Sequence, residues 1–555
     1  MGLFERHQGL IERAVQASAE RGYWSAFSEM PSPKVYGESA PADGKAAFES
    51  HLGRRFELDQ PASGGELACE RSPYGLPLGV SYPVCDAQGL LEAAQKAMPA
   101  WQRLGARERV GLCAEAVVRL NARSFEIAHA VMATTGQGWM MAFQAGGPHA
   151  QDRALEALAY AWVEQSRIPA EAIWEKPQGK NPPIRMRKNF EIVGRGVALV
   201  IGCGTFPTWN TYPGLFAALA TGNAVIVKPH PHAVLPAAIT VRVLRQLLLE
   251  QGLDANLVSL CVTDQPEVTQ ALATHPAVAS VDFTGSNAFG QWLMAHSKQA
   301  QVYAELAGLN HVLIDSTSAY KAMLDNLAFT LCLYSGQMCT TTQAILVPQA
   351  GIETDEGPKS VQAVQTDLAA AIDRLLTKPE VACAVLGAIQ STDTLARIEA
   401  AQSGQWGRVV RPSAALTHPE FPGARVHTPV LLACDAADEQ AYMHERFGPI
   451  AFVVTVPSTE AGIKLSERMV REHGALTVGV YSTREPVIQA MTEATWRSRV
   501  ALSINLTGAV FVNQTAAYSD YHATGGNPAA NASYSDSAFV ANRFRVVQRR
   551  QHIQD

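Results

Sequence analysis

Two residues of this chain combine a reactive side chain with surroundings that would let it react: Cys339 and Glu305. Cys339 lies in YSGQMCTT, among small and polar residues, where a thiol could be reached by substrate and an oxyanion could find a donor. Glu305 interrupts the apolar run VYAELAG, where an unpartnered carboxylate would be costly to bury. Two interpretations remain open for it, a general base beside the cysteine or an ion pair with an arginine. Cys332, in the apolar run LAFTLCLY, is expected in the core.

A second group of residues could bind a phosphate. In DFTGSNAFG, a strand runs directly into Gly285 and Ser286, after which the spacing becomes helical, so backbone N–H groups and the helix dipole would face an anion. The spacing is G-x-x-x-x-G followed by Gln291, which is neither the lysine-bearing phosphate loop nor G-x-G-x-x-G, and a plain helix cap explains it equally well. Lys228 ends the run VIVK, where it could reach a ribose or phosphate oxygen or simply face solvent.

The elements around these residues indicate an α/β fold. Apolar runs at 196–202, 223–228, 258–262 and 278–285 predict buried strands, and 235–252 predicts a helix between two of them. Strands separated by helices predict a doubly wound parallel sheet. A second α/β block is expected from about 340 to 500, with strand runs AILVP and IAFVVTV.

The remaining segments are expected to support this body. Residues 1–70 are rich in turn signals and are interpreted as an extension that packs on the body, whereas 90–165 has the spacing of successive helices. Residues 170–194 resemble an exposed hairpin or linker, and the tail FRVVQRRQHIQD a terminal strand.

Composition excludes several classes of function. The 555 residues carry 45 basic and 51 acidic side chains, a net charge of −6, which gives no basic surface for nucleic acid. No run approaches the roughly 20 apolar residues of a membrane span, and the charged start MGLFERHQGL is no signal peptide, so we expect a cytoplasmic protein with no membrane partner. The nine cysteines show no C-x-x-C pair or zinc-like spacing, and we expect no metal site.

Five motifs occur in an order that resembles the aldehyde dehydrogenase superfamily from about residue 70 to the C-terminus: LATGNAVIVKP, FTGS, ELAG, GQ-x-C and ERFGPI. The resemblance implies an N-terminal extension (1–70), a cofactor-binding domain (71–170 and 195–305), a catalytic domain (306–510) and a β oligomerisation flap (171–194 and 511–555). It assigns roles to seven residues: Cys339 as nucleophile, Glu305 as general base, Lys228 and Glu445 as ribose ligands, Phe447 as a nicotinamide neighbour, and Gly285 with Ser286 at the pyrophosphate.

The chemistry that this resemblance implies is the oxidation of an aldehyde to a carboxylic acid. The Cys339 thiolate attacks the aldehyde, the thiohemiacetal gives hydride to a nicotinamide, and Glu305 activates water to hydrolyse the thioester. Because members that pass the acyl group to coenzyme A typically lack the base, Glu305 predicts a hydrolytic enzyme.

The chain departs from the family at two positions that matter for function. In GCGTFPTWN, Thr205 stands where the family has an oxyanion-donating Asn, so the donor is either Thr205 or the displaced Asn210. After Lys228, Pro231 stands where a carboxylate commonly repels a 2′-phosphate. We therefore expect NADP as cofactor, favoured by Lys228 and His230, with NAD also admissible.

A narrower resemblance covers essentially the whole chain. RGYWSAFSEMPSPKVYGE, TTGQGWMMAFQAGG, CGTFPTWN and SDYHATGGNPAANAS resemble the PaaN-type aldehyde dehydrogenases of bacterial phenylacetate degradation. The resemblance implies a ring-opened coenzyme A-linked substrate, 3-oxo-5,6-dehydrosuberyl-CoA semialdehyde. Another coenzyme A-linked or free aldehyde, and a catalytically inactive scaffold of the same fold, remain the alternatives.

Two further expectations follow. The flap implies a homo-oligomer, dimer or higher, because an unpaired sheet edge would be an aggregation risk. His149 and His522 lie in polar, glycine-rich loops and are expected at the surface rather than at a substrate entrance.

Overall fold

The computed structural model describes residues 2–554, and its first sheet gathers the strands predicted between residues 196 and 285. The sheet has the order β7-β6-β5-β8-β9, and every neighbouring pair is parallel. Its strands are β5 (Val197–Ile201), β6 (Ala224–Lys228), β7 (Val258–Leu260), β8 (Val278–Thr284) and β9 (Gln301–Glu305). Both faces are covered, which is why these strands are almost continuously apolar. The predicted α/β class with a parallel sheet is confirmed.

The register of this sheet brings the predicted phosphate and base residues to one edge. Ile201 pairs with Lys228 on one side and with Phe283 on the other, and Thr284 pairs with Glu305. Because the strands are parallel, their carboxyl ends coincide, and Lys228, Gly285 and Glu305 all lie where such sheets bind ligands.

Helices cover this sheet on both faces. The connecting elements are α9 (Thr211–Ala220), α10 (Leu235–Glu250), η1 (Ala255–Leu257), α11 (Pro266–Thr274) and α12 (Asn287–His296). The helical region predicted from 90 to 165 consists of α4 (Ala87–Arg103), α5 (Gly105–Asn121), α6 (Ser124–Thr135), α7 (Trp139–Gly146) and α8 (Pro148–Ser166). The Trp101 indole N–H donates to the carbonyl of Leu219 at 2.9 Å, which ties α4 to α9.

A second sheet forms the rest of the body, as the runs AILVP and IAFVVTV predicted. Its order is β14-β17-β18-β12-β10-β19-β20, parallel except for the pair β14–β17. The strands are β10 (His311–Ile314), β12 (Ala344–Pro348), β14 (Arg408–Arg411), β17 (Val430–Asp435), β18 (Ile450–Val456), β19 (Thr477–Tyr481) and β20 (Ala501–Ile504). Its helices are α13 (Tyr320–Cys332), η2 (Leu333–Gly336), α14 (Val361–Leu375), α15 (Pro379–Leu386), α16 (Thr392–Gln402), α17 (Glu439–Tyr442), α18 (Thr459–His473) and α19 (Glu485–Ser498).

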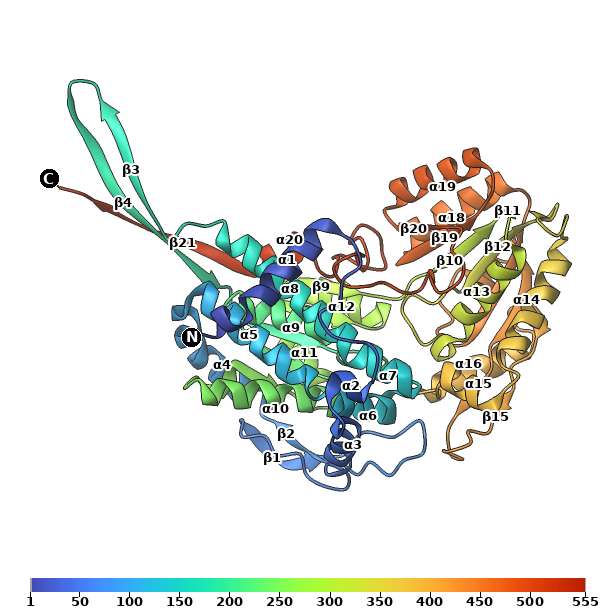
Figure 1. Cartoon of the computed structure of the whole chain (residues 1–555), viewed down its shortest axis with the longest axis horizontal. Helices are drawn as coiled ribbons and strands as arrows, with labels where there is room; N and C mark the ends of the chain where they lie inside the picture. Colours follow the sequence, from blue (N-terminus) through green and yellow to red (C-terminus); the bar gives the residue numbers. More distant parts are fainter. Residues whose placement is uncertain (1, 555) are drawn as a thin grey trace.

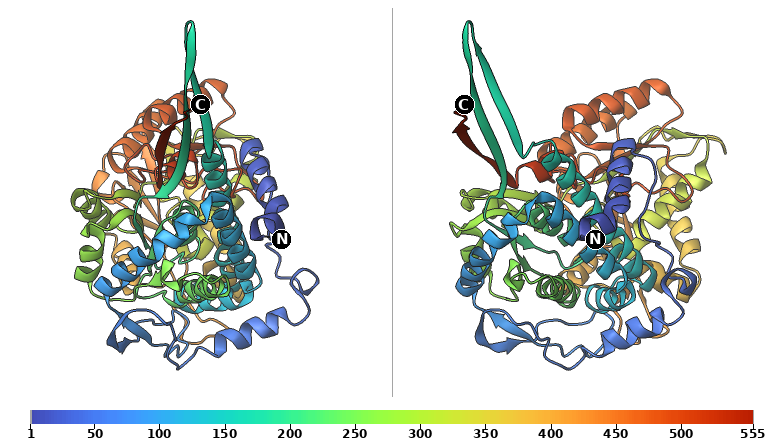
Figure 2. Two further views of the ribbon diagram at one scale, coloured as in Figure 1. Left: turned by 90° about the vertical axis from the view of Figure 1, so that its left-hand side faces the viewer. Right: turned by 60° about the vertical axis from the view of Figure 1, so that its left-hand side comes forward.

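An antiparallel ribbon projects from the body (Figures 1 and 2). It consists of the hairpin β3 (Glu171–Gln178) and β4 (Asn181–Gly194), with β21 (Phe544–His552) along the outer side of β4. Both the predicted hairpin and the predicted terminal strand are confirmed. Of the predicted flap segment 511–555, however, β21 is the part that joins the ribbon. Residues 511–543, including α20 (Ser537–Ala541), return to the body because their aromatic side chains, such as Tyr518 and Tyr534, are buried there.

The N-terminal extension packs on the body, as predicted, but it begins with a long helix that the turn signals did not suggest. Helix α1 (Leu3–Glu20) buries Phe4 and Ile11 against α5 and α8. The extension continues with α2 (Pro33–Tyr36), α3 (Ala40–Glu49) and the antiparallel pair β1 (Ala62–Leu67) and β2 (Tyr82–Cys85). Four short strands complete the fold: β11 (Ser316–Thr317), β13 (Glu353–Thr354), β15 (Ala415–Leu416) and β16 (Val426–His427).

Among residues 2–554, the structure contains no helix with the length and hydropathy that a membrane crossing requires.

Candidate active site

Cys339 lies on a tightly bent segment that follows α13. Three consecutive residues, Tyr334, Ser335 and Gly336, have positive φ angles of 52°, 48° and 62°. A Cβ atom at Gly336 would lie 2.3 Å from the carbonyl oxygen of Gly448, so only glycine fits this close approach. Asn310 then fixes the backbone beyond the bend, because its Nδ2 donates to the Cys339 carbonyl at 2.7 Å. Cys332 is fully buried, as predicted.

Glu305 is the last residue of β9 and is only 2% exposed. Its carbonyl accepts from the Gly285 N–H at 3.1 Å, and the next residue, Leu306, donates to the carbonyl of Ala529 at 2.7 Å. Its carboxylate contacts His522, with 3.0 Å between Oε2 and Nε2. The partner of this buried carboxylate is therefore a histidine beside the cysteine, rather than an arginine.

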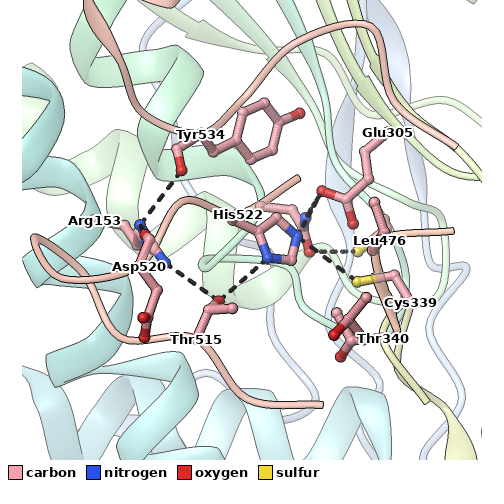
Figure 3. Close-up of polar contacts among 12 residues, drawn as sticks. Arg153, Glu305, Cys339, Thr340, Leu476, Thr515, Asp520, His522 and Tyr534 are labelled. Carbon is pink, nitrogen blue, oxygen red and sulfur yellow. Dashed lines mark hydrogen bonds and ion pairs between the residues drawn. The ribbon is translucent and has the colours of Figure 1, made fainter. Parts of the chain in front are cut away.

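His522 is the main site residue that the sequence analysis placed wrongly. It was expected at the surface, but it is 3% exposed, and its Nε2 lies 4.0 Å from the Cys339 sulfur (Figure 3). The ring packs edge-on against Trp209, with 4.6 Å between ring centroids, and near Tyr534, which explains why a polar, glycine-rich loop turns inward. His149 pairs with Glu29 and keeps 41% of its side chain exposed, so its predicted surface position is confirmed.

Electrostatics differ sharply for the thiol and the carboxylate. Burial raises the pKa of the Cys339 thiol well above its ordinary value, and the neighbouring Glu305 raises it further. Burial alone would also raise the pKa of Glu305, but the charge and hydrogen bond of His522 outweigh it, and the pKa is lowered. At neutral pH the site therefore contains a thiol beside a carboxylate, which is the pairing that a base-assisted nucleophile requires.

The two candidate oxyanion donors follow β5 in the same loop. The Asn210 amide is buried, and its Nδ2 lies 3.5 Å from Oε2 of Glu305. Its Oδ1 accepts from the Cys203 thiol at 3.4 Å. The Thr205 hydroxyl lies 3.9 Å from the Cys203 sulfur, and its carbonyl accepts from Gln137 at 2.8 Å. Asn210 thus contacts the base, whereas the assignment of either residue to the oxyanion stays a prediction.

The candidate cofactor residues lie along the carboxyl edge of the first sheet. Lys228 is half-buried, and burial lowers the pKa of its ammonium group. Burial also lowers the pKa of His230 to about 3, and its Nδ1 accepts from the His232 N–H at 3.1 Å. His230 is therefore neutral and adds no positive charge for a 2′-phosphate. Gly285 and the exposed Ser286 lead into α12, and the Ser286 hydroxyl makes no capping bond.

Glu445 and Phe447 approach Cys339 from the second sheet. They line one small cavity together with Gly308 and Met338. Burial raises the pKa of the Glu445 carboxyl to about 7, even though the Gly308 N–H and Arg397 act in the opposite direction.

Gln343 holds the loop that carries Glu445. Its Nε2 donates to the carbonyls of Tyr442 and His444, and its Oε1 accepts from the Arg446 N–H at 2.6 Å. Gln343 and Asn310 were not predicted from the sequence, because an amide that binds backbone far along the chain has no local pattern.

The same site offers one set of metal-ligating atoms. The carboxylate of Glu305, the thiol of Cys339 and the ring of His522 place their ligand atoms within 4.8 Å of one another, a spacing that one divalent cation could bridge. The expectation that the reaction needs no metal stays a prediction.

Comparisons with known proteins show the family and the fold. Residues 83–536 match the sequence model of the Aldehyde dehydrogenase family. A vanillin dehydrogenase from Pseudomonas fluorescens is 26% identical over 443 residues, which are 78% of this chain and 81% of that protein. A solved NAD-dependent aldehyde dehydrogenase from Burkholderia multivorans is 55% identical, covers 100% of both chains and has a TM-score of 0.98. A 1-pyrroline-5-carboxylate dehydrogenase from Thermus, 16% identical over 96% of this chain and 99% of that one, has a TM-score of 0.73 and shows the fold alone.

Proposed function

This chain belongs to the aldehyde dehydrogenase family, and on that premise we propose that it oxidises an aldehyde to a carboxylic acid with a nicotinamide cofactor. The observation that carries the proposal is the pairing of a protonated thiol, Cys339, with a buried, ionised carboxylate, Glu305, at the carboxyl edge of the first sheet. Glu445 and Phe447 line a small cavity beside Met338, the residue that precedes Cys339.

The residues of the chain divide the reaction into two halves. In the first, Glu305 takes the proton of the Cys339 thiol and releases it to solvent, the sulfur forms a bond to the aldehyde carbon, and Asn210 or Thr205 donates to the oxyanion. The cofactor, when bound, supplies the acceptor for the hydride. In the second half, Glu305 takes a proton from water, which adds to the thioester carbon, and the sulfur leaves as the acid forms.

The cofactor is held, in this proposal, by residues at the two sheet edges. Lys228 and Glu445 would bind ribose hydroxyls, Gly285 and Ser286 would face the pyrophosphate, and Phe447 would lie beside the nicotinamide. The absence of a carboxylate at Pro231 supports NADP, whereas the neutral His230 contributes nothing to that preference. The 55% identical relative is described as NAD-dependent, which supports NAD. Both cofactors therefore belong in the test.

For the substrate, we propose the ring-opened coenzyme A-linked semialdehyde of phenylacetate degradation. The support is the resemblance of the segments around residues 21–38, 134–147 and 519–533 to the PaaN-type enzymes. A free aromatic aldehyde is the second candidate, because the curated relative with 26% identity is a vanillin dehydrogenase.

A spectrophotometric assay at 340 nm tests the activity. The purified chain is given NADP or NAD with vanillin, with simple aliphatic aldehydes, and with the coenzyme A semialdehyde generated in situ. We expect the cofactor to be reduced with the coenzyme A substrate, and the rate to fall by at least about a thousandfold in Cys339→Ala, because this variant lacks the thiol that forms the thioester. Cys434→Ala removes a thiol from β17, outside the site, and should retain activity.

The possible outcomes separate the candidates. Turnover of vanillin alone would replace the phenylacetate substrate by a free aromatic aldehyde. Retained turnover in Cys339→Ala would contradict the nucleophile. Silence with every aldehyde, although the chain binds cofactor, would make the inactive scaffold the better description.

A further inference from the structure

Four side chains form a continuous line of polar contacts that ends at the base. Arg153 Nη2 lies 3.3 Å from Thr515 Oγ1, which lies 3.3 Å from Nδ1 of His522. Nε2 on the far side of the same ring lies 3.0 Å from Oε2 of Glu305 (Figure 3). The line joins α8, the C-terminal segment (residues 511–543) and the end of β9.

The direction of the hydrogen bonds along this line is fixed at one end. A guanidinium has donors only, so the Thr515 oxygen accepts from Arg153 and its hydroxyl hydrogen is free to point at His522. At the other end the ionised carboxylate of Glu305 can only accept, so Nε2 of His522 carries a proton. His522 consequently donates to Glu305.

The surrounding structure holds this histidine rigidly. Arg153 is fully buried, forms an ion pair with Glu156 at 2.7 Å, and donates to the carbonyls of Asp520 and Tyr534. His522 and Tyr534 also exchange backbone hydrogen bonds, at 3.1 and 2.9 Å. The ring therefore cannot turn away from the base without breaking several buried contacts.

The two carboxylate oxygens of Glu305 differ in their hydrogen-bond partners. Oε2 accepts from His522 and faces Asn210. Oε1 is buried and has no hydrogen-bond partner among residues 2–554. A buried, unpaired carboxylate oxygen next to Cys339 is suited to accept a proton from a molecule that enters the site.

We propose that His522 is the positioning residue of the general base: its Nε2–H holds Oε2 of Glu305 and leaves Oε1 free to take the proton of the attacking water. This inference rests on the proposed function, because it concerns the hydrolysis of the Cys339 thioester. It adds to the pair Cys339 and Glu305 a third residue that lies 217 positions from the base.

The step balances without a further reactant. The water loses a proton to Oε1 of Glu305, and its oxygen forms a bond to the thioester carbon. Collapse of this adduct breaks the carbon–sulfur bond and releases the acid. The electron pair of that bond stays on the Cys339 sulfur, which takes back the proton from Oε1. The proton on Nε2 of His522 is donated throughout and is never transferred.

The titratable groups that face Glu305 come from every element around it. They are Cys339 after η2, Cys203 after β5, Arg153 on α8 with its partner Glu156, and His522 and Tyr534 on the C-terminal segment. Loss of the His522 donor would leave burial as the dominant influence, so the pKa of Glu305 would rise. Hydrolysis needs the ionised carboxylate. The acidic limb of the pH–rate profile for hydrolysis should therefore move to higher pH.

The test uses 4-nitrophenyl acetate, which acylates a reactive thiol without any aldehyde or cofactor. The burst of nitrophenolate measures acylation of Cys339, and the steady-state rate measures hydrolysis. We expect His522→Leu to retain the burst and to lower the steady-state rate at pH 6 about tenfold. The steady-state rate should recover as the pH rises, because a tenfold loss at pH 6 corresponds to a shift of the acidic limb by about one pH unit. His522→Gln, whose amide can donate from a similar position, should lie close to the wild type.

Two further variants keep the test decisive. Thr515→Val preserves the side-chain volume and removes the hydroxyl that faces Nδ1 of His522. It should shift the acidic limb in the same direction and lower the steady-state rate at pH 6 about threefold. His149→Leu, at the half-exposed histidine, should have no effect. If His522→Leu fails to fold, as judged by its melting curve, Thr515→Val and His522→Gln carry the test.

Specific results would overturn the proposal. If the steady-state rate of His522→Leu fell equally at every pH, His522 would have only a packing role. If this variant lost the burst, His522 would act on Cys339 instead of on Glu305. A wild-type chain that shows no burst also contradicts it. A wild-type chain that hydrolyses the ester but reduces no cofactor with any aldehyde would refute the proposed function and leave this inference standing.

Discussion

The Glu445 carboxyl is a candidate cofactor ligand whose protonation changes near neutral pH. Burial raises the pKa of this carboxyl to about 7. In the proposed function it accepts hydrogen bonds from ribose hydroxyls, and a carboxylate is a stronger acceptor than a neutral acid. Cofactor affinity should therefore depend on pH through this one residue.

We expect cofactor to bind several-fold more weakly at pH 6 than at pH 8. With a pKa near 7, about a tenth of Glu445 is ionised at pH 6 and about nine tenths at pH 8. Titration of protein fluorescence with NAD and NADP measures the Kd. Glu445→Gln should bind weakly at both pH values, while Glu439→Gln, an exposed carboxylate on the preceding helix, should follow the wild type. An identical pH dependence in Glu445→Gln would contradict the ribose assignment.

The residues that were predictable are those with local signals. Cys339 and Glu305 stand in short motifs whose neighbours define their environment, and the structure places both beside the carboxyl edge of the first sheet. His522 could not be found in this way, because its function depends on Arg153 and Thr515, which reach it through the folded chain. Its own loop has the composition of a surface turn.

Strand β8 and the chain just before β21 are joined by a buried ion pair. Arg543 donates to both oxygens of Asp282, at 2.8 and 2.6 Å, and its guanidinium lies over the rings of both Tyr303 and Phe539. Both charged side chains are almost completely buried. The pair therefore fixes where the chain leaves the body to enter the ribbon.

Arg543→Met should lower the free energy of unfolding by about 3–5 kcal/mol, because it leaves the Asp282 carboxylate buried without its partner. Urea denaturation measures the change. The double variant Arg543→Met with Asp282→Asn should recover part of the loss. Arg549→Met, at an exposed position of β21, should change stability by less than about 0.5 kcal/mol. Equal losses in the two single arginine variants would show that the ion pair contributes nothing particular.

At this scale the sequence was most informative for buried strands. Runs such as VALVI and AVIVK are apolar on both faces because helices cover both sides, and their ends were predicted within two residues. Helix α1 was missed because only a few of its residues are buried, among them Phe4 and Ile11, and most of the others are polar. Turn signals further along the extension then dominated the interpretation.

The projecting ribbon leaves two unpaired strand edges, on β3 and on β21 (Figure 1). It also exposes apolar side chains: Ile173 is 48% exposed and Val547 is 52% exposed. Edges of this kind are normally covered in soluble proteins. The expected homo-oligomer remains a prediction, and a second copy of this chain is the occupant that the ribbon suits.

Replacement of Val546 and Val547 by lysine should convert the oligomer to a monomer, because two charges on the edge strand oppose pairing with another sheet. Light scattering after size-exclusion chromatography gives the mass. Val35→Lys, at a 57% exposed valine of α2, provides the control and should leave the mass unchanged. A wild-type monomer, or an undisturbed oligomer in the double variant, would contradict the role of the ribbon.

The contacts between β9 and residues 529–531 have a consequence for the order of events during synthesis. Leu306 donates to Ala529, and Asn531 bonds to Ala304 through both its backbone and its side chain, so the base is anchored by residues up to 227 positions further along the chain. A nascent polypeptide that has emerged only as far as Cys339 already contains the thiol and the carboxylate, but it lacks the histidine that donates to that carboxylate. The base is thus positioned only after residues 522–531 have been synthesised, long after the nucleophile itself.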